Sequence, residues 1–437
     1  MASHWLSEPA IGGAYAYLRP GGTPADRDRL AGPIAPGLRL AGEAASARYP
    51  GTMHGAWFSG ELAVEQLVAE GSAGEGRRTL VVGAGWAGIA AARRIVAAGG
   101  RAFVIEAAPV AGGRARTDHS LGGPVHLGAA WIHGIDGNPI AHLLTDAGVG
   151  WEPSRWGSNR TFLLGQPALD DAEVEAVWTL RRAVAATIAG ARRDASVDAA
   201  LGPVLRAALA AVDCPPRQRA VLECWVHSEY ENLYAAPIDD LSLLYCTEPF
   251  SMSGADGSIT GPLDRAVEHA IASLDVRLRT TVEKIEAIGA RWRVISAAAT
   301  EVVDSVIVTA SAGALRAGCI VFDPPLPIDV QSSLEHLGAG VLAKVFFEFD
   351  EPFWQPRWAF WTTALTRPPL ELWVDATKLA GRPVLCGFAT GAHARRMETM
   401  RRDELCALAD ELLSDVVEFR SHGGGSATPG CLSPNDA

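Results

Sequence analysis

The feature that most constrains the fold is a glycine-rich turn between an apolar strand and an alanine-rich helix. Gly83, Gly85 and Gly88 stand in the spacing Gly-x-Gly-x-x-Gly, and a second strand over 101–106 ends on an acid, Glu106. In such a turn the first glycine permits the tight bend, the second lets the backbone approach a pyrophosphate, and the third lets the helix pack against the strand. A carboxylate at the end of the second strand accepts hydrogen bonds from ribose hydroxyls. The segment therefore predicts a βαβ unit that binds a dinucleotide.

Length, charge and cysteine spacing exclude several classes of protein. A chain of 437 residues is too long for one ordinary core, which predicts two or three domains. The net charge of -12 disfavours binding to the phosphates of nucleic acid. Seven scattered cysteines show no metal-ligand spacing, and no run approaches the ~18 apolar residues of a membrane span. We expect a cytoplasmic protein with no metal site, no membrane segment and no nucleic-acid partner.

Two segments beyond the βαβ unit point to the identity of the dinucleotide. Gly113 and Arg114, in Ala-Gly-Gly-Arg-Ala-Arg-Thr, offer bare backbone and a guanidinium to a second phosphate group. Gly128 and Ala129 belong to Leu-Gly-Ala-Ala-Trp-Ile-His-Gly. Both segments resemble those of the flavin-containing amine oxidase family, above all its polyamine oxidases and histone demethylases, in which they contact FAD. The resemblance implies an α/β fold, in which a Rossmann-type FAD-binding domain is joined to a substrate domain with a mixed sheet and helices.

The order of the motifs differs from the order in that family. Segments that resemble the end of the family's chain here precede the βαβ unit, at 5–9, 13–15, 40–43 and 49–60. The part that usually precedes them resembles 385–391 and the following helix, which end this chain. The sequence thus predicts a circular permutation, with 70–78 as the linker, because its glycines and charges suit an exposed connection.

The expected domain boundaries follow from this order. We assign 1–69, 79–125 and 250–318 to the FAD-binding domain, 126–249 and 319–418 to the substrate domain, and 419–437 to a disordered tail. The residue pattern predicts helices over 173–211, broken at Gly202–Pro203, and over 401–417. It predicts strands at 275–285, 302–309 and 341–349.

Lys344 is the first candidate catalytic residue. It lies inside an apolar strand, where an ammonium loses hydration and has a lowered pKa unless it is paired. The alternative is a lysine whose stem packs in the core while its head reaches the surface. The resemblance implies that Lys344 is bridged by water to flavin N5 and takes part in the reaction with oxygen.

Three further residues take their candidate roles from the resemblance. Tyr15 matches an aromatic residue that forms a cage around the substrate nitrogen, where cation–π attraction explains the residue type. Thr52 occupies the second cage position, as in histone demethylases. His133 matches a histidine near the substrate amine, where a neutral imidazole accepts a proton. Taken without the resemblance, Tyr15 is a core or rim aromatic and His133 is a solvated side chain after a turn.

The resemblance also assigns cofactor contacts outside the glycine turn. Glu43, preceded by Gly42, matches a glutamate that bonds the ribityl chain. Met53 matches a backbone contact to the flavin ring, Val282 a backbone contact to adenine, and Trp5 opens the displaced segment. Covalent members of the family carry a cysteine where this chain has Ala14, which implies non-covalent FAD.

These observations predict an FAD-dependent amine oxidase that acts on a small-molecule amine and O2. A hydride passes from the carbon beside a neutral amine to flavin, which gives an imine, and oxygen is reduced to hydrogen peroxide. The expected substrate is a polyamine, or an alkylamine or cyclic amine from a biosynthetic pathway. Two alternatives stay open, a flavin desaturase or L-amino-acid oxidase, and a non-catalytic FAD-containing binding protein. The oligomeric state is not indicated by the sequence.

Overall fold

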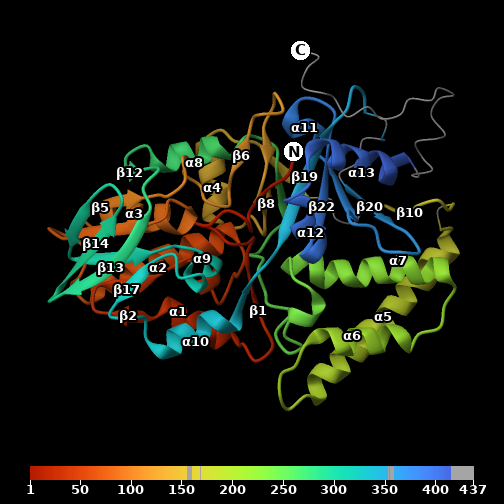
Figure 1. Ribbon diagram of the computed structural model, residues 1–437, viewed down its shortest axis with the longest axis horizontal. Helices are drawn as coiled ribbons and strands as arrows, with labels where there is room; N and C mark the ends of the chain where they lie inside the picture. The colour runs from red at the N-terminus through yellow and green to blue at the C-terminus, as the bar shows by residue number, and fades with distance from the viewer. Residues whose placement is uncertain (155–159, 168, 353, 355–358, 415–437) are drawn as a thin grey trace.

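The computed structural model describes residues 1–154, 160–167, 169–352, 354 and 359–414. The tail expected at 419–437 lies outside these residues. Figure 1 shows two bodies side by side, one that contains α3 and β5 on the left and one on the right in which a sheet stands above a group of helices. This arrangement is the mixed α/β architecture that the sequence predicts.

A six-stranded sheet forms the centre of the left-hand body. Its strand order is β12 (Asp275–Arg277), β5 (Arg101–Ile105), β4 (Arg78–Val82), β16 (Ser305–Val308), β3 (Leu38–Leu40) and β2 (Pro33–Ala35). Neighbouring strands are parallel from β12 to β3, and only β2 runs antiparallel to its neighbour. The central strands are buried along nearly their whole length, as expected for a parallel sheet that is covered on both faces.

Two layers cover this sheet. Alternate residues such as Val81 and Ile307 pack against α2 (Met53–Ala69) and α3 (Trp86–Ala97). The other alternate set packs against an antiparallel sheet of β15 (Thr300–Val303), β14 (Arg291–Ser296) and β13 (Val282–Ile288), to which β17 (Val321–Asp323) adds in parallel. The predicted βαβ unit is confirmed as β4, α3 and β5.

Much of the N-terminal segment is an integral part of the left-hand body, whereas its first residues pack in the right-hand body, where Ala2 pairs with Val345. β3 pairs with β16, and α2 packs on α3. The connection from α2 to β4 is held at its start by Glu70, which accepts hydrogen bonds from Arg39 and the backbone of Gly37. The displaced segment therefore completes the dinucleotide-binding sheet, and the permutation of the chain stays a prediction.

The right-hand body is built on a five-stranded sheet. Its order is β10 (Arg160–Leu163), β20 (Ala359–Thr363), β21 (Leu372–Asp375), β22 (Val384–Thr390) and β19 (Leu342–Glu348). One face, with Val345 and Phe347, packs against α12 (Gly391–Met397) and α13 (Arg402–Ser414). The opposite face, with Phe346 and Phe388, forms a separate apolar cluster with Trp131.

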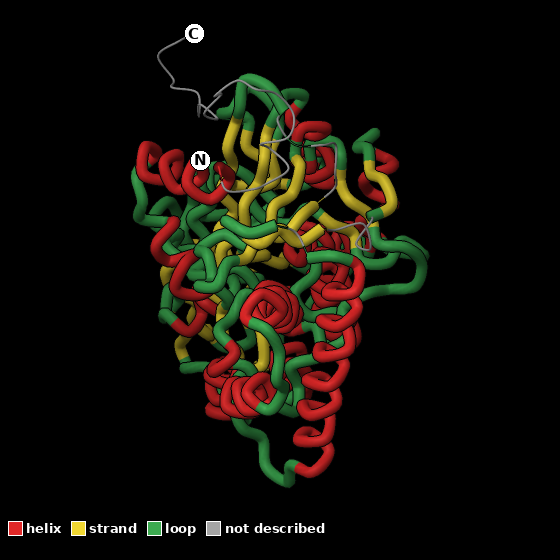
Figure 2. The backbone as a smooth tube through the Cα atoms, turned by 90° about the vertical axis from the view of Figure 1, so that its right-hand side faces the viewer, coloured by secondary structure: helices red, strands yellow, loops and turns green. Residues whose placement is uncertain are grey.

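Helices lie below this sheet, as the side view in Figure 2 shows. They are α5 (Asp171–Asp194), α6 (Leu201–Ala210) and α7 (Pro216–His227), and α7 continues into a π-helical turn, η3 (Ser228–Asn232). The predicted break at Gly202–Pro203 is wrong, because the chain leaves the helix at 195–200 instead. Pro203 lies in the first turn of α6, where its missing N–H has no carbonyl to bond.

Short elements join the two bodies. β1 (Ala16–Leu18) pairs with β18 (Leu337–Ala339), and β11 (Gly257–Ile259) lies between β8 (Trp131–Ile132) and β9 (Trp151–Pro153). β6 (Thr117–Asp118) pairs with β7 (Val125–His126). The other helices of the described ranges are α1 (Pro24–Ala31), α4 (Pro139–Asp146), α8 (Leu263–Ile271), α9 (Ala312–Arg316), α10 (Ile328–His336) and α11 (Thr377–Ala380), with 3₁₀ turns at Glu43–Ala45 and Ile238–Asp240. Since β17 pairs with β13, the boundary expected at 318 divides a sheet, and the other boundaries stay predictions.

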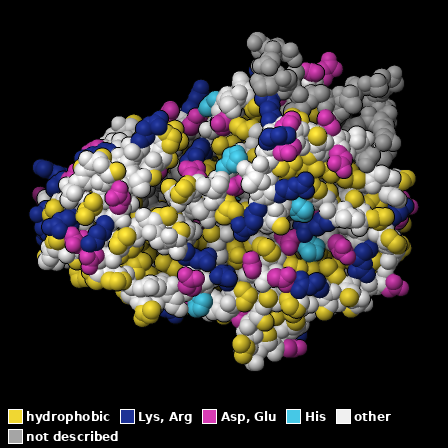
Figure 3. Space-filling model, in the orientation of Figure 1, with side chains coloured by type: hydrophobic (Ala, Val, Ile, Leu, Met, Phe, Trp, Pro, Cys, Tyr) yellow, Lys and Arg dark blue, Asp and Glu magenta, His cyan; other side chains and the backbone are white. Residues whose placement is uncertain are grey.

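The surface carries charges of both signs. Figure 3 shows acidic and basic side chains interspersed over the face in view. None of the helices in the described ranges has the length and apolarity needed to cross a bilayer. Within the same ranges, no group of three or more His, Cys, Asp or Glu side chains is placed to hold a metal ion.

Candidate active site

A cavity of about 600 Å³ lies between the carboxyl ends of the parallel strands and the five-stranded sheet. Every candidate site residue from the sequence lines it, apart from Gly88. The lining candidates are Trp5, Tyr15, Gly42, Glu43, Thr52, Met53, Gly83, Gly85, Glu106, Gly113, Arg114, Gly128, Ala129, His133, Val282 and Lys344. The structure thus brings together residues from nearly the whole length of the chain.

The glycine turn opens onto one end of this cavity. Gly83 has a left-handed backbone with φ +102°, and the space beside Gly85 is open where a side chain would start. Gly88 does not line the cavity and has the packing role expected of the third glycine. A Cβ at Gly88 would lie 1.9 Å from the carbonyl oxygen of Gly83, so this glycine allows the helix to pack on the turn.

The polar groups at this end fit a dinucleotide. Glu106 is held by the backbone N–H groups of Ala84 and Ala108, each at 2.7 Å, which fixes its carboxylate at the end of β5. The indole Nε1 of Trp86, in the first turn of α3, is buried without a partner among the described residues, and Trp86 lines the cavity. A buried donor without a partner costs free energy that a polar ligand can offset. The open glycine, the fixed acid and this orphan donor together fit the diphosphate and ribose of FAD.

Residues 127–129, called the flavin-facing turn after the role that the resemblance implies, are held by two distant parts of the chain. Trp5 donates its indole N–H to the carbonyl of Leu127, and Lys344 Nζ donates to the carbonyl of Gly128 at 2.6 Å. A Cβ at Gly128 would lie 1.9 Å from the carbonyl oxygen of Arg114, so only glycine fits there. The turn therefore has a fixed shape that depends on residues more than 100 positions away on either side.

Lys344 is buried and keeps its head inside the protein. Its side chain reaches the carbonyl oxygen of His126 as well as that of Gly128, and its Nζ lies 5.0 Å from the ring centre of Trp131 and 5.2 Å from that of Phe388. Burial lowers the pKa of Lys344 to about 8, which confirms the shift expected for a lysine in an apolar strand. The alternative of a head at the surface is wrong, since the residue is only 4% exposed.

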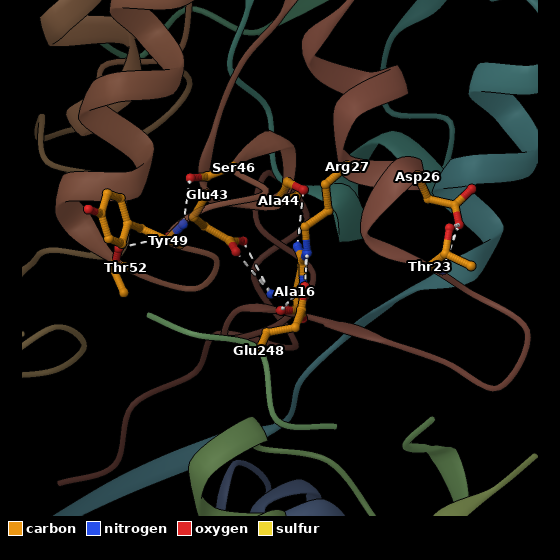
Figure 4. A network of polar contacts seen from close by, with 10 residues as sticks. All are labelled: Ala16, Thr23, Asp26, Arg27, Glu43, Ala44, Ser46, Tyr49, Thr52 and Glu248. Atoms are coloured by element: carbon orange, nitrogen blue, oxygen red, sulfur yellow. Dashed lines mark hydrogen bonds and ion pairs between the residues drawn. The ribbon is translucent and has the colours of Figure 1, made fainter. Parts of the chain in front are cut away.

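A polar network holds the chain on both sides of Tyr15, and Figure 4 shows the part of it in which Glu43 and Arg27 reach Ala16. The carboxylate of Glu43 accepts the backbone N–H of Ala16 and an N–H of Arg114, which also donates to the carbonyl of Ala14. Arg27 donates to the carbonyl of Ala16 from the other side. The loop is thus fixed on both sides of Tyr15.

The hydroxyls of both expected cage residues are engaged by backbone groups of the protein. Tyr15 donates to the carbonyl of Leu233, at the end of the π-helical turn, and burial together with Glu43 raises the pKa of its phenol. Thr52 is the N-cap of α2, and its hydroxyl donates to the carbonyl of Tyr49 and accepts from the N–H of Gly55. The hydroxyl of Thr52 is therefore used for helix capping.

His133 lies in an acidic and aromatic corner of the cavity. Its Nδ1 is 3.5 Å from Asp256, whose other oxygen accepts the backbone N–H of Gly134. The rings of His133 and Phe250 are nearly perpendicular, with their centres 5.0 Å apart. Behind it, His54 is buried and contacts the carbonyl of Phe250 through Nε2. Burial, and then the nearby charge of His133, lowers the pKa of His54 to about 4.

Two buried histidines predict a loss of stability in mild acid. The pKa of His54 is about 4 and that of His126 is about 3, below the ordinary value of 6.5. Between pH 6.5 and about 4 the unfolded chain therefore binds protons that the folded chain does not, so stability falls as the pH falls. The loss is on the order of 3 kcal/mol per histidine. Denaturation midpoints across this range measure it, and His54→Gln, which retains a donor for Phe250, should flatten the slope. An unchanged slope would contradict the assignment to His54.

The sequence missed several residues around the substrate end. Asn232 and Leu233 enter the cavity from the π-helical turn, which has no sequence signature, and Phe250 follows an irregular segment. Trp361, Leu372 and Phe388 line it from three strands of the five-stranded sheet. β22 is apolar along its length and buried on both faces, so its pattern does not say which side chains meet a cavity.

Comparison with known proteins identifies the family to which the sequence is similar. The profile of the family described as flavin containing amine oxidoreductase matches residues 1–68, 86–168 and 218–424. Polyamine oxidase 4 of Oryza sativa subsp. japonica is 28% identical over 364 residues, which cover 78% of this chain and 73% of that protein. A lysine-specific histone demethylase 1 homolog of the same plant is 28% identical over 73% of this chain but only 40% of its own length.

Solved structures share the fold. A putrescine oxidase bound to putrescine superposes with a TM-score of 0.62 at 19% identity, over 78% of this chain and 81% of that chain. Cyclohexylamine oxidase from Brevibacterium oxydans gives a TM-score of 0.60 at 19% identity, over 78% of this chain and 82% of that chain. With a family profile that matches most of the sequence and a cavity that fits FAD, the chain belongs to the flavin containing amine oxidoreductase family.

Proposed function

We propose that this protein is an FAD-dependent amine oxidase that converts an amine to an imine. The observation that carries the proposal is that the dinucleotide turn, Tyr15 and Lys344 line the same cavity. FAD, when bound, accepts a hydride from the carbon beside the amine nitrogen and passes the electrons to O2, which leaves as hydrogen peroxide. Ala14, which has no sulfur, lines the cavity where covalent members have a cysteine, and this supports non-covalent FAD.

The chain's own residues prepare the amine for this step. The ring of Tyr15, fixed through its hydroxyl, limits the orientations of the substrate nitrogen. His133 accepts the proton that an ammonium must lose before its lone pair can assist the reaction, and Asp256 holds its ring. Apolar walls exclude water and favour the neutral amine. Lys344 places a fixed cation against the flavin-facing turn at Gly128.

The relatives leave the substrate class open. Polyamine oxidase 4 is named for polyamines, and the two structural neighbours are named for putrescine and cyclohexylamine. An oxidase of amino acids needs a cation for the substrate carboxylate. The arginines that line the described part of the cavity, Arg114 and Arg116, are already paired with Glu43 and Glu8. This pairing favours an amine over an amino acid.

Anaerobic mixing of the yellow holoprotein with a panel of amines tests the proposal. We expect at least one amine to bleach the flavin absorbance, with a rate that rises with pH because only the neutral amine reacts. L-amino acids serve as the control panel. Bleaching by amino acids alone would favour the oxidase of amino acids, and no bleaching by any compound would favour a binding protein. A rate that does not change with pH would contradict the requirement for a neutral amine.

A further inference from the structure

A row of four side chains crosses the cavity face of the five-stranded sheet. Lys344 of β19 is paired in register with Phe388 of β22, Phe388 with Leu372 of β21, and Leu372 with Trp361 of β20. All four line the cavity. Because neighbouring strands lie about 4.8 Å apart, the row extends for about 14 Å from the lysine to the tryptophan.

The row is polar at one end only. Lys344 stands beside the flavin-facing turn, and beyond it Phe388 and Leu372 are buried at 5% and 7% exposure. Leu342, the neighbour of Lys344 on the same face of β19, extends the apolar surface. A substrate with its nitrogen near Tyr15 and Lys344 therefore has its body against hydrocarbon.

The carboxylates of the cavity are already engaged, within the part of the chain that the structure describes. Glu8, Glu43 and Glu248 form ion pairs with arginines, Glu106 accepts two backbone N–H groups, and Asp256 accepts the backbone N–H of Gly134. No carboxylate belongs to the row itself. A second ammonium lying along the row would lose its hydration without gaining a counter-charge, which is unfavourable.

We infer that the substrate is a monoamine with an apolar body that lies along Phe388, Leu372 and Trp361, and that diamines and polyamines are poor substrates. The inference rests on the proposed function and narrows it. It departs from the substrate named for the polyamine oxidases that this chain resembles. The specificity comes from the sheet, because each of the three residues is contributed by a different strand.

A matched pair of substrates tests the inference in the holoenzyme. Hexylamine and hexamethylenediamine have the same carbon chain and differ by one terminal amine. We expect kcat/KM for hexylamine to exceed that for the diamine by roughly 100-fold, within the range that apolar pockets give when a substrate group is mismatched. The values of kcat/KM for benzylamine and cyclohexylamine should also exceed those for putrescine and spermidine. A diamine that reacts as well as hexylamine would overturn the inference.

Variants of Trp361 test whether the row of side chains causes the preference for a monoamine. Trp361→Glu places a carboxylate at the far end of the row, so kcat/KM for hexylamine should fall at least tenfold, mainly through KM, while that for the diamine rises. Trp361→Phe keeps the wall apolar and should retain the wild-type order of substrates. The melting temperature and flavin absorbance of both variants verify the fold. An equal loss for both substrates in Trp361→Glu would show that the row does not select the substrate.

The outcomes separate this inference from the proposed function. If neither amine of the pair, nor any other amine, bleaches the flavin, the proposed function fails and the inference falls with it. If the diamine is preferred, the proposed function stands and the inference alone fails. Asp256→Asn then identifies the cause, since loss of a diamine preference in that variant would make Asp256 the anchor of the second ammonium.

Discussion

Replacing Lys344 by methionine should slow the reaction of the enzyme with O2 by about 100-fold, the usual effect of removing one fixed group that stabilises developing negative charge. The reduction of flavin by amine should change far less, because Lys344 contacts carbonyl oxygens and aromatic rings, and its partners hold the cavity wall without it. Methionine retains the length and apolar character of the lysine stem. Stopped-flow mixing of the amine-reduced enzyme with oxygenated buffer measures the rate.

The pH dependence provides a second measure of the same role. Because the pKa of Lys344 is about 8, its ammonium loses a proton as the pH rises above that value. The oxygen reaction of the wild type should therefore slow above pH 8, whereas that of Lys344→Met should not. The rate of flavin reduction should instead rise with pH, because it needs a neutral amine. The pH dependence therefore distinguishes the two half-reactions.

One readout of Lys344→Met does not involve turnover. The charge of Lys344 is the second cause, after burial, of the low pKa of His126, so this pKa should rise in the variant as followed by NMR. The control is Lys378→Met, because Lys378 is mostly exposed and lies outside the cavity. An unchanged rate of the oxygen reaction in Lys344→Met would contradict the role assigned to the lysine, whether or not the pKa of His126 rises.

The sequence predicted the cofactor end of the site because its chemistry is local. Gly83, Gly85 and Glu106 belong to one short segment whose spacing follows from the geometry of a strand, a turn and a helix. The prediction for Lys344 had a different basis, since a charge inside an apolar strand is rare enough to indicate function. Both are local patterns, and the structure places both at the cavity.

The substrate end was harder to predict because it is assembled from tertiary pairing. The partnership of Lys344, Phe388 and Leu372 depends on the register of three strands, which no single segment encodes. The predicted strand at 275–285 is wrong, because the structure has two strands there. Arg279 between them has a left-handed backbone with φ +54°, which is uncommon for arginine and so could not be predicted from the residue type. Strand register and backbone conformation at such positions depend on tertiary contacts rather than on the local sequence.

The ion pair of Arg27 and Glu248 is a further feature that the sequence did not reveal. Arg27 of α1 is fully buried and binds Glu248 through two nitrogens, at 2.7 and 2.8 Å. It also donates to the carbonyls of Ala16 and Ala44. These residues adjoin Tyr15 and Glu43, so one guanidinium ties together two loops of the site, as Figure 4 shows.

Replacing Arg27 by methionine should therefore destabilise the protein by about 3–5 kcal/mol, because it leaves the carboxylate of Glu248 buried without its partner. Chemical denaturation of the holoprotein measures the loss. The loop of Tyr15 also loses a donor at Ala16, so KM for the amine should rise more than kcat falls.

The double variant Arg27→Met, Glu248→Leu separates charge from packing. It removes both charges and keeps apolar volume, so it should recover most of the stability that Arg27→Met loses. KM should stay high, because methionine at position 27 cannot donate to the carbonyls of Ala16 and Ala44 as Arg27 does. If the double variant were as unstable as the single one, the cost would lie in those lost carbonyl bonds rather than in an unpaired carboxylate. If KM returned to the wild-type value, Arg27 would have no part in positioning Tyr15.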